Sequence, residues 1–460
     1  MTIPMNVNYY LGYNWENFVI GSIITSLSGT SAFLFGKLSK PQGTAIFIIT
    51  SSSWSILSIF AAIPFYFDNL SYIDSLFEAI SGITTTGATI LSDIESKSPG
   101  ILLWRAILHS IGGFGIIAAG IAIFPSFKTL GLNNLLYSEY SDALKQRLPN
   151  IRSVVINITL IYYGLIFFCI FFYYMAGMSF FDSICHGMST VSTGGFANYN
   201  DAIGHYNSAK IEVITIIFMI LGSLPFLSYL KIIKSFHIYY DEQISFFIRI
   251  IIFSSIFVCI WTYFNVSNVS QTLGFRRAIF TNVSIITSTG HTIYDYTQWS
   301  FVSILTFFLS FIGGCGGSAS GGIKVFRIII LIKLIKNYIY TILKEEKNLE
   351  ISINNKILMD KDIRSVYMFF LIYIMTFAVS SVIMCYISKS DFLTSISSVS
   401  AMLTNLGPGF SKFIGPDGNY SIFSDLAKLF LSFLMILGRL EILPIYICFF
   451  SLFSKKIKEI

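Results

Sequence analysis

Long apolar stretches alternate along this chain with shorter segments that mix apolar residues with Ser, Thr and Gly. A helix that crosses the hydrocarbon core of a bilayer needs about 20 mostly apolar residues. The stretch at 298–338 is too long for one regular helix and is interrupted by a cluster of glycines. With that stretch included, we expect spanning segments at 16–36, 43–67, 102–125, 153–176, 209–230, 244–264, 298–338, 364–388 and 424–452.

Four semi-polar segments lie between alternate pairs of these spans, at 72–91, 180–197, 274–292 and 391–409. Each begins with a helix-like pattern and ends in Ser or Thr near a Gly. They are too short and too polar to cross a bilayer. Polar backbone at membrane depth is tolerated only where it lines water or is buried in protein. We therefore expect four re-entrant hairpins.

The hairpins end in a four-residue motif that recurs roughly every hundred residues, which indicates an internal repeat. Its copies are Thr84, Thr85, Thr86, Gly87; Val191, Ser192, Thr193, Gly194; Thr287, Ser288, Thr289, Gly290; and Thr404, Asn405, Leu406, Gly407. The pattern predicts an all-α polytopic membrane protein. Four helix–pore hairpin–helix repeats would surround one pore with pseudo-fourfold symmetry, after one extra N-terminal helix. The expected boundaries are 1–40 for the extra helix and 41–128, 129–236, 237–345 and 346–460 for the repeats.

Composition supports a membrane protein. Of the 460 residues, 54% are hydrophobic and 12% are charged, against roughly 25% charged in an ordinary soluble domain. If the hairpins face outward, more than two thirds of the 30 Lys and Arg residues fall in cytoplasmic segments, with Arg105 among the external minority. Basic residues favour the cytoplasmic side, so we expect a cytoplasmic C-terminus. The net charge of +6 therefore reflects orientation in the membrane and does not indicate nucleic-acid binding.

The hairpin motifs have the residue types of a cation-selective pore. A dehydrated monovalent cation needs a cage of oxygens, which rings of backbone carbonyls provide. Glycine reaches the unusual dihedral angles that such a backbone requires. Each short hairpin helix would also direct its negative C-terminal end toward the axis. One such motif alone would ordinarily be a polar loop, but four in corresponding places favour a cation pore in which the sixteen motif residues bind the ion.

These segments resemble the Trk/Ktr/HKT superfamily of potassium transporters, and most closely the bacterial Trk-type translocating subunit. The resemblance is carried by SGITTTGAT (81–89), VSTGGF (191–196), TSTGHT (287–292), TNLGPGF (404–410), GGFGI (112–116), FIGGCGGSASGGIKVFRI (311–328) and LGRLEIL (437–443). It implies potassium uptake across the inner membrane of a bacterium by a homodimer with a separate cytoplasmic nucleotide-binding regulatory subunit. Trk-type members commonly carry two extra N-terminal helices, whereas only one fits here.

The resemblance leaves the coupling of transport open. In the related plant transporters a Ser at the first filter position goes with sodium preference, so four glycines favour potassium. A sodium-selective or sodium-coupled transporter on the same scaffold is the alternative. Channel-like transport and symport with protons or sodium both remain compatible with the sequence. We expect potassium as substrate, no resident cofactor and contact with membrane lipid. Few ionisable residues lie within the spans, and none forms a known catalytic set, so we expect no enzyme activity.

The segment from 313 to 322 contains six glycines and would break a helix. It does not fit a phosphate-binding loop, because Ile323 separates the last glycine from Lys324. We interpret it as an unwound, mobile barrier under the filter whose peptide groups lack helical partners; close helix packing is the alternative. The resemblance also places a gating loop here. The expected gate residues are Gly313, Gly314, Gly316, Gly317, Ser318, Gly321, Gly322, Lys324 and Arg439.

Arg439 lies within the last span, where an unpaired charge is costly. It either faces the aqueous cavity and helps to gate the pore, or forms an ion pair with Glu441, or extends its side chain to the membrane surface. The most polar stretch, 340–364, is either a solvated loop or a docking surface for the regulatory partner.

Overall fold

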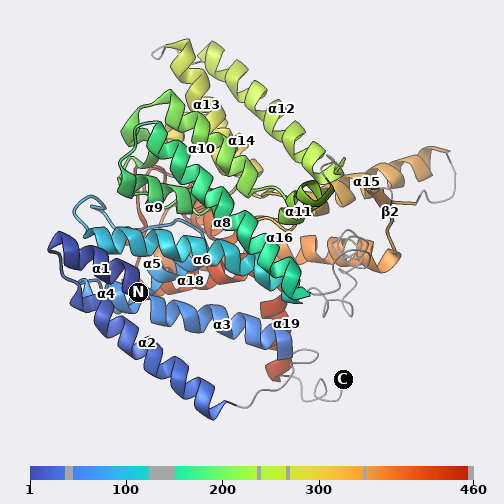
Figure 1. Ribbon diagram of the computed structural model, residues 1–460. Coiled ribbons are helices and arrows are strands. Elements are labelled where there is room, and N and C mark those ends of the chain that lie inside the picture. Colours follow the sequence, from blue (N-terminus) through green and yellow to red (C-terminus); the bar gives the residue numbers. More distant parts are fainter. Residues whose placement is uncertain are drawn as a thin grey trace.

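The structure, a computed structural model, describes residues 1–36, 45–123, 151–235, 240–265, 270–344, 350–354 and 356–453. It is built almost entirely of helices (Figure 1). The predicted repeat boundaries at 40, 128, 236 and 345 all lie at residues outside the described ranges or directly next to them. They therefore stay predictions.

Each repeat consists of an outer helix, a short pore helix and an inner helix. The outer helices are α3 (Ala45–Ala61) with its continuation α4 (Ile63–Phe67), α8 (Ile151–Met175), α12 (Glu242–Asn265) and α16 (Asp360–Ser388). The pore helices are α5 (Tyr72–Ile83), α9 (Phe180–Val191), α13 (Gln271–Ile286) and α17 (Phe392–Thr404). The inner helices are α6 (Pro99–Ile123), α10 (Ala209–Gly222) with α11 (Phe226–Ser235), α14 (Ser300–Ser310) with α15 (Val325–Lys344), and α18 (Asp425–Arg439) with α19 (Leu443–Phe453).

The repeats close into a ring in chain order. The inner helix of each repeat packs against the pore helix of the next, as α6 does on α9, α10 on α13, α14 on α17 and α18 on α5. The last of these contacts joins the fourth repeat to the first. The fold class predicted from the sequence, a polytopic all-α protein, is thus confirmed.

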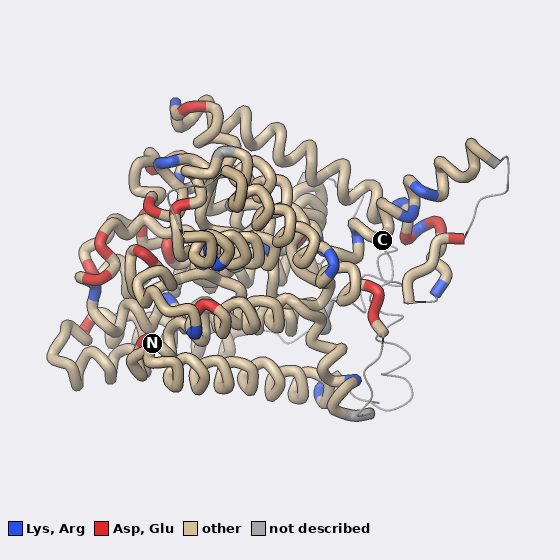
Figure 2. Tube along the Cα trace, turned by 90° about the horizontal axis from the view of Figure 1, so that it is seen from above, with Lys and Arg blue, Asp and Glu red and all other residues tan. Residues whose placement is uncertain are grey.

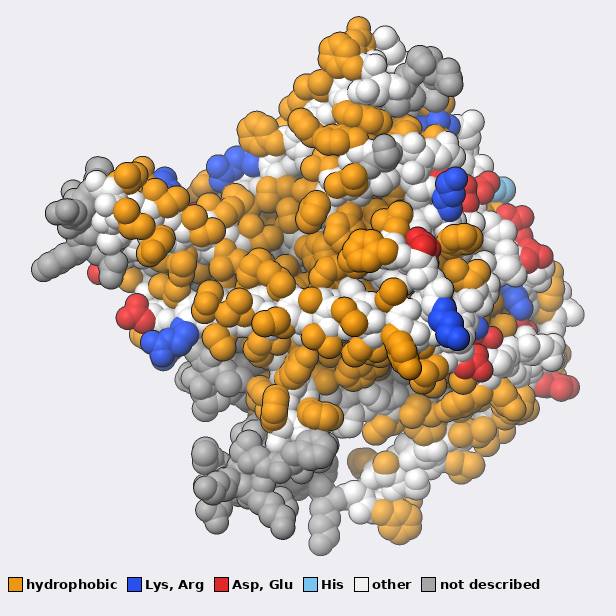
Figure 3. Space-filling model, turned by 180° about the vertical axis from the view of Figure 1, so that it is seen from behind, with side chains coloured by type: hydrophobic (Ala, Val, Ile, Leu, Met, Phe, Trp, Pro, Cys, Tyr) orange, Lys and Arg blue, Asp and Glu red, His pale blue; other side chains and the backbone are white. Residues whose placement is uncertain are grey.

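The surface fits a bilayer environment. Six helices of the described chain are long and apolar enough to cross a membrane, and two bent helix pairs also qualify. Apolar side chains cover the middle of the face in Figure 3, whereas charged side chains gather toward its edges. In Figure 2, Asp and Glu residues gather at the end of the molecule away from α15. A protein in water would bury such a large apolar surface, so we expect membrane lipid to cover it.

Two elements precede the first repeat. The predicted extra helix is α2 (Glu16–Phe35), and before it lies a short helix that the sequence pattern did not predict, α1 (Thr2–Leu11). Asn8 of α1 accepts a hydrogen bond from Gly100 N at 2.6 Å, at the start of α6. Helix α1 thus partners a free backbone amide of α6. The remaining elements are η2 (Ala202–Tyr206), η3 (Tyr296–Gln298), η4 (Tyr420–Ile422), β1 (Ser352–Ile353) and β2 (Lys356–Ile357).

Two of the predicted spans are bent helix pairs. The inner helices at 209–230 and 424–452 bend by 89° and 109°. At the first bend, Ser223 O accepts from Cys315 N at 3.0 Å and Gly317 O accepts from Phe226 N at 3.1 Å. These bonds from the glycine segment replace helical ones, and Pro225 has no backbone N–H to lose. The α6 helix of the first repeat runs without such a break.

Candidate functional site

The four pore helices lead into strands of the same unusual conformation. In each strand a non-glycine residue with positive φ is followed, two residues later, by a glycine with positive φ. The non-glycine residues are Thr85, Thr193, Ser288 and Asn405, and the glycines are Gly87, Gly195, Gly290 and Gly407. Positive φ is strained for residues with a Cβ and free for glycine. A conformation shared by four separate segments indicates one shared role.

The predicted motif of the second repeat is out of register by one residue. Gly194 N donates to Ser189 O at 2.9 Å, as Thr86 N donates to Ser81 O at 2.9 Å in the first repeat. Gly194 therefore corresponds to Thr86, and Gly195 corresponds to Gly87. The corrected motif is 192–195, with Val191 as the last residue of α9. The adjacent glycines made the two registers indistinguishable from sequence.

Gly194 is a glycine for a different reason. A Cβ at Gly194 would lie 2.6 Å from the imidazole ring of His109, which comes from α6 of the neighbouring repeat. Its φ is not among the positive values. The side chain of His109 therefore excludes a Cβ at 194, whereas backbone conformation requires a glycine at 195.

The four glycines meet around one axis. A Cβ on any of them would collide with a carbonyl oxygen of the next repeat, at 1.9–2.6 Å. The pairs are Gly87 with Gly194 O, Gly195 with Thr289 O, Gly290 with Leu406 O and Gly407 with Thr86 O. All four glycines also line one cavity of about 70 Å³. The strands thus form a closed ring in which each glycine lies against a carbonyl group of the next repeat.

Hydroxyl groups fasten the start of each strand to its pore helix. Thr84, Ser192, Thr287 and Thr404 each donate to a helix carbonyl four residues earlier, at 2.7–2.8 Å. The buried hydroxyls of Thr85 and Ser288 have no hydrogen-bond partner in the described part of the chain. Their oxygens are free to face water or an ion. In the fourth repeat the Asn405 amide donates to Thr86 Oγ1 at 2.9 Å and so joins two strands.

The electrostatics of this region favour cations. The negative C-terminal ends of all four pore helices lead into the ring. On the loops beyond it, Asp201, Asp295 and Asp417 line a second cavity of about 210 Å³. Burial, together with the nearby carboxylates of Asp295 and Asp201, raises the pKa of Asp417 above its usual value. Three acidic side chains thus lie together at the mouth of the ring.

The predicted unwound segment lies between α14 and α15 and is confirmed as non-helical. Gly321 packs so closely that a Cβ would lie 2.2 Å from Thr404 O, at the end of the fourth pore helix. Ser320 Oγ donates to Thr287 O at 2.7 Å, at the start of the third filter strand. The segment therefore crosses the region next to the inner end of the filter, where we expected the gate residues Gly313, Gly314, Gly316, Gly317, Ser318, Gly321 and Gly322.

The peptide groups of the segment lack helical partners, as expected, and several of them bond to distant residues. Ala319 N donates to Gly222 O at 3.3 Å, and Gly316 N donates to Gln243 Oε1 at 3.1 Å. Three of these partners, Gly222, Ser223 and Phe226, lie at the bend between α10 and α11. Sequence alone could not show this, because the partners lie far away along the chain.

Arg439 contacts the segment directly. Its Nη1 donates to Ala319 O at 2.8 Å, and its side chain is buried. The alternative ion pair with Glu441 is wrong, because Glu441 pairs with Arg327. Burial likewise rules out a side chain that reaches the membrane surface. Lys324 is also buried and donates to Ser320 O. Two cationic groups thus bind carbonyls of the glycine segment.

The sequence reading missed a buried polar cluster behind the filter. It counted Arg105 as an external charge, yet Arg105 is 2% exposed. It pairs with Glu78, a pore-helix residue that was not singled out. A Glu within a re-entrant hairpin, followed by Arg and His in the next span, was the signal that could have revealed this cluster.

Comparisons with known proteins agree with this architecture. The chain is 33% identical over 417 residues to the Trk system potassium uptake protein TrkI of Halomonas elongata, covering 89% of this chain and 84% of that protein. It is 35% identical over 419 residues to TrkG of Escherichia coli, covering 88% and 84%. The crystal structure of the potassium transporter TrkH from Vibrio parahaemolyticus matches with a TM-score of 0.88 at 28% identity, covering 97% and 94%.

The family described as TrkH, cation transport protein, matches residues 15–460. This match agrees with the prediction from the sequence that the chain is a transporter and not an enzyme. With a ring of four filter strands and this match over nearly its whole length, the chain belongs to the TrkH family of cation transport proteins.

Proposed function

We propose that this protein takes up potassium across the cytoplasmic membrane of a bacterium through the ring of four filter strands. The observation that carries the proposal is the closed ring of Gly87, Gly195, Gly290 and Gly407, each against a carbonyl of the next repeat. Such a ring replaces the hydration shell of a cation with fixed oxygens. The named relatives are potassium uptake proteins, which supports potassium as the ion.

Sodium transport on the same scaffold is the second candidate. All four ring positions are glycine, so no hydroxyl from these residues narrows the ring. This observation supports potassium over the smaller ion. Flux measured with both ions in competition separates the two candidates.

We further propose that the glycine segment at 313–324 gates the pathway from the cytoplasmic side. It lies against the inner end of two pore helices and binds Arg439 and Lys324. A cation that leaves the filter inward would meet these positive charges. Helix α15, which follows the segment, extends away from the body of the protein (Figure 1). A regulatory subunit that binds α15 would therefore be able to move the segment. We also expect the protein to assemble as a homodimer.

Radiotracer rubidium uptake tests the proposal in cells that lack their own potassium systems. Cells that produce the protein should accumulate rubidium, and a large excess of sodium should reduce uptake only slightly. Cells with an empty vector are the control. Uptake no greater than in those cells, from protein that is inserted in the membrane, would contradict the proposal. Strong competition by sodium would favour the second candidate.

A further inference from the structure

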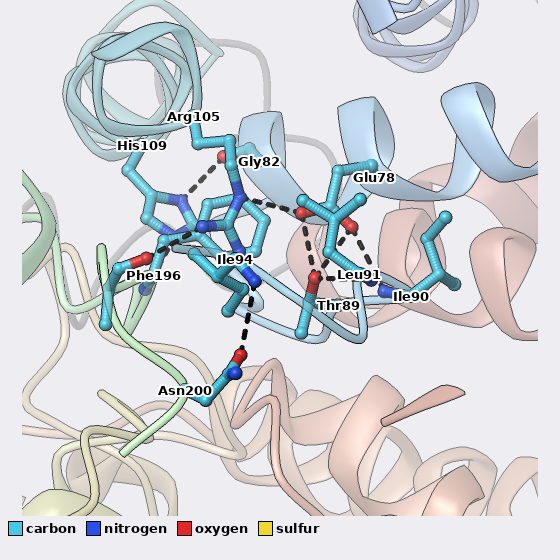
Figure 4. Close-up of polar contacts among 11 residues, drawn as sticks. Glu78, Gly82, Thr89, Ile90, Leu91, Ile94, Arg105, His109, Phe196 and Asn200 are labelled. Carbon is cyan, nitrogen blue, oxygen red and sulfur yellow. Dashed lines mark hydrogen bonds and ion pairs between the residues drawn. The ribbon is translucent and has the colours of Figure 1, made fainter. Parts of the chain in front are cut away.

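A buried ion pair lies behind the filter strand of the first repeat (Figure 4). Glu78 of α5 accepts a hydrogen bond from Arg105 Nε of α6 at 2.8 Å. The two side chains are 0% and 2% exposed. Burying two charges is costly unless their other polar atoms also find partners. The further hydrogen-bond partners of Glu78 and Arg105 therefore indicate which parts of the protein the pair connects.

The carboxylate of Glu78 also accepts hydrogen bonds from the filter strand of the first repeat. It accepts from Thr89 Oγ1, at 3.1 Å to each oxygen, and from Ile90 N at 3.2 Å. Both donors lie two or three residues beyond Gly87. A charged acceptor makes stronger bonds than a neutral one. Glu78 therefore fixes the outer end of the first strand to its own pore helix.

The guanidinium of Arg105 reaches into the second repeat. Its Nη1 donates to Ala197 O at 2.8 Å, two residues beyond Gly195. Its Cζ lies 4.0 Å from the ring centroid of Phe196, within the range of a cation–π contact. One side chain thus binds Glu78 and the outer end of the neighbouring strand.

His109 adds a second link one turn further along α6. Its Nδ1 lies 2.9 Å from Gly82 O, and its Nε2 lies 3.2 Å from Phe196 N. A carbonyl can only accept and an amide can only donate, so the imidazole is neutral with its proton on Nδ1. Its ring also stacks on Phe196, with centroids 4.2 Å apart. Figure 4 shows both α6 side chains pointing toward the second strand.

The other repeats lack a carboxylate at this place. At the position of Glu78, counted back from the ring glycine, they have His186, Thr281 and Ser398. Three ion pairs of the described chain cross between repeats. These are Arg276 with Glu212 at 2.5 Å, Lys428 with Asp74 at 2.6 Å, and Arg327 with Glu441. None of them has a hydrogen bond to a filter strand among those in the described chain. The connection between the first two strands through a buried ion pair is therefore one asymmetric feature of the ring.

We propose that Glu78 and Arg105 are positioning residues for ion selection. They hold the outer ends of the first two filter strands at a fixed spacing, and thereby the carbonyls of Thr86 and Gly194 in the ring. This inference rests on the proposed function of the ring. Loosening the pair lets the ring adapt to the smaller sodium ion, so discrimination falls even when the protein folds and inserts normally.

The test compares Glu78→Gln and Arg105→Lys with the matched control Glu212→Gln. Glu78→Gln keeps the shape but removes the charge and one acceptor. Arg105→Lys keeps the charge but cannot reach Glu78 and Ala197 with a fixed fork. The measured quantity is the sodium concentration that halves rubidium uptake, per amount of protein in the membrane. Loss of one charge-assisted bond predicts about a fivefold drop in this concentration for the first two variants, and none for the control.

The outcomes separate a positioning role from a structural one. Unchanged sodium inhibition in inserted Glu78→Gln protein would overturn the proposal, and so would an equal change in Glu212→Gln. If Glu78→Gln fails to insert, Thr89→Val removes one donor to the carboxylate without a change of shape. A shift of about twofold there supports the positioning role, and a wild-type value overturns it. Gly87→Ser distinguishes the two proposals. If it changes discrimination and Glu78→Gln does not, the pair fails and the filter stands. If it changes nothing, the filter proposal itself fails.

Discussion

Two glycine-rich segments with irregular backbone face each other inside this protein, the filter ring and the segment at 313–324. In the ring, one glycine per repeat repeats the same positive φ and the same close approach to a neighbouring carbonyl. In the segment, the glycines occur once, in the third repeat, and bond to the bends of other helices. The ring presents carbonyls to a common axis, whereas the segment presents carbonyls to Arg439 and Lys324.

The comparison shows that glycine serves two purposes here. Fourfold repetition yields equivalent oxygens, which a cation site needs. A single copy breaks the symmetry and binds the cationic groups of Arg439 and Lys324, which under the proposed function lie on the path of a departing cation. Changes in the ring should therefore alter which ion passes, and changes in the segment should alter how many pass.

The largest effect is expected in the ring. Gly195→Ala would place a Cβ 2.1 Å from Thr289 O and force a strained φ, so rubidium uptake should fall more than about tenfold. Gly194→Ala meets only the His109 side chain and should have a smaller effect. Gly164→Ala, where nothing lies within 4 Å, is the control for a harmless substitution. A severe loss at 194 with normal uptake at 195 would restore the register first predicted from the sequence.

The next effect concerns the segment. Deletion of Gly316–Ser320 and Arg439→Ala should each raise rubidium flux, by up to about tenfold for loss of one charged hydrogen bond, with sodium discrimination unchanged. If both act on one barrier, the double variant should show less than the sum of the two effects on the logarithm of flux.

Two comparisons make the segment test specific. Arg249→Ala removes an exposed arginine of α12 whose contacts in the described chain, with Ser245 O and the Phe246 ring, lie within its own helix, and it should leave flux unchanged. Lower rubidium flux in single variants that are inserted in the membrane would contradict the proposal that the segment is a gate. Additive effects would show that the segment and Arg439 act independently.

A moderate effect is expected where the ring departs from symmetry in the fourth repeat. Asn405 donates to Thr86 Oγ1 and to Met435 O, at 2.9 and 3.0 Å. Asn405→Ser resembles the third repeat but loses both bonds, so sodium should inhibit rubidium uptake about threefold more strongly. Asn157→Ser in α8, where the amide bonds only within its helix, should behave as wild type. If sodium inhibits the Asn405→Ser variant as it does the wild type, the contact between these strands does not contribute to ion selection.

The smallest effect concerns the outer mouth. The pKa of Asp417 is raised, so as pH falls this carboxylate takes up its proton before an ordinary aspartate does and loses its attraction for cations. Rubidium uptake at low external rubidium should therefore decline on mild acidification. Asp417→Asn should remove that part of the decline and lower uptake slightly at neutral pH, more so at low ionic strength. An identical pH profile in both proteins would exclude Asp417 as the titrating group.

The sequence by itself determined the number and type of the repeats. Bilayer thickness sets the length of an apolar span, so spans, hairpins and the Gly87, Gly290 and Gly407 motifs could be read from local pattern. The unwound glycine segment followed equally from helix propensity. These features depend on residues near each other along the chain.

Only the tertiary structure decided the rest, because the deciding partners are distant in sequence. The second strand has two adjacent glycines because His109 occupies the space that a Cβ at position 194 would take. The bend between α10 and α11 depends on bonds to the glycine segment, such as Cys315 N to Ser223 O. Glu441 pairs with Arg327 and leaves Arg439 to bind Ala319 O. Glu78 and Arg105 find each other only when the first hairpin folds back against α6. A buried polar group takes whichever partner the fold brings within reach, and no local pattern encodes that choice.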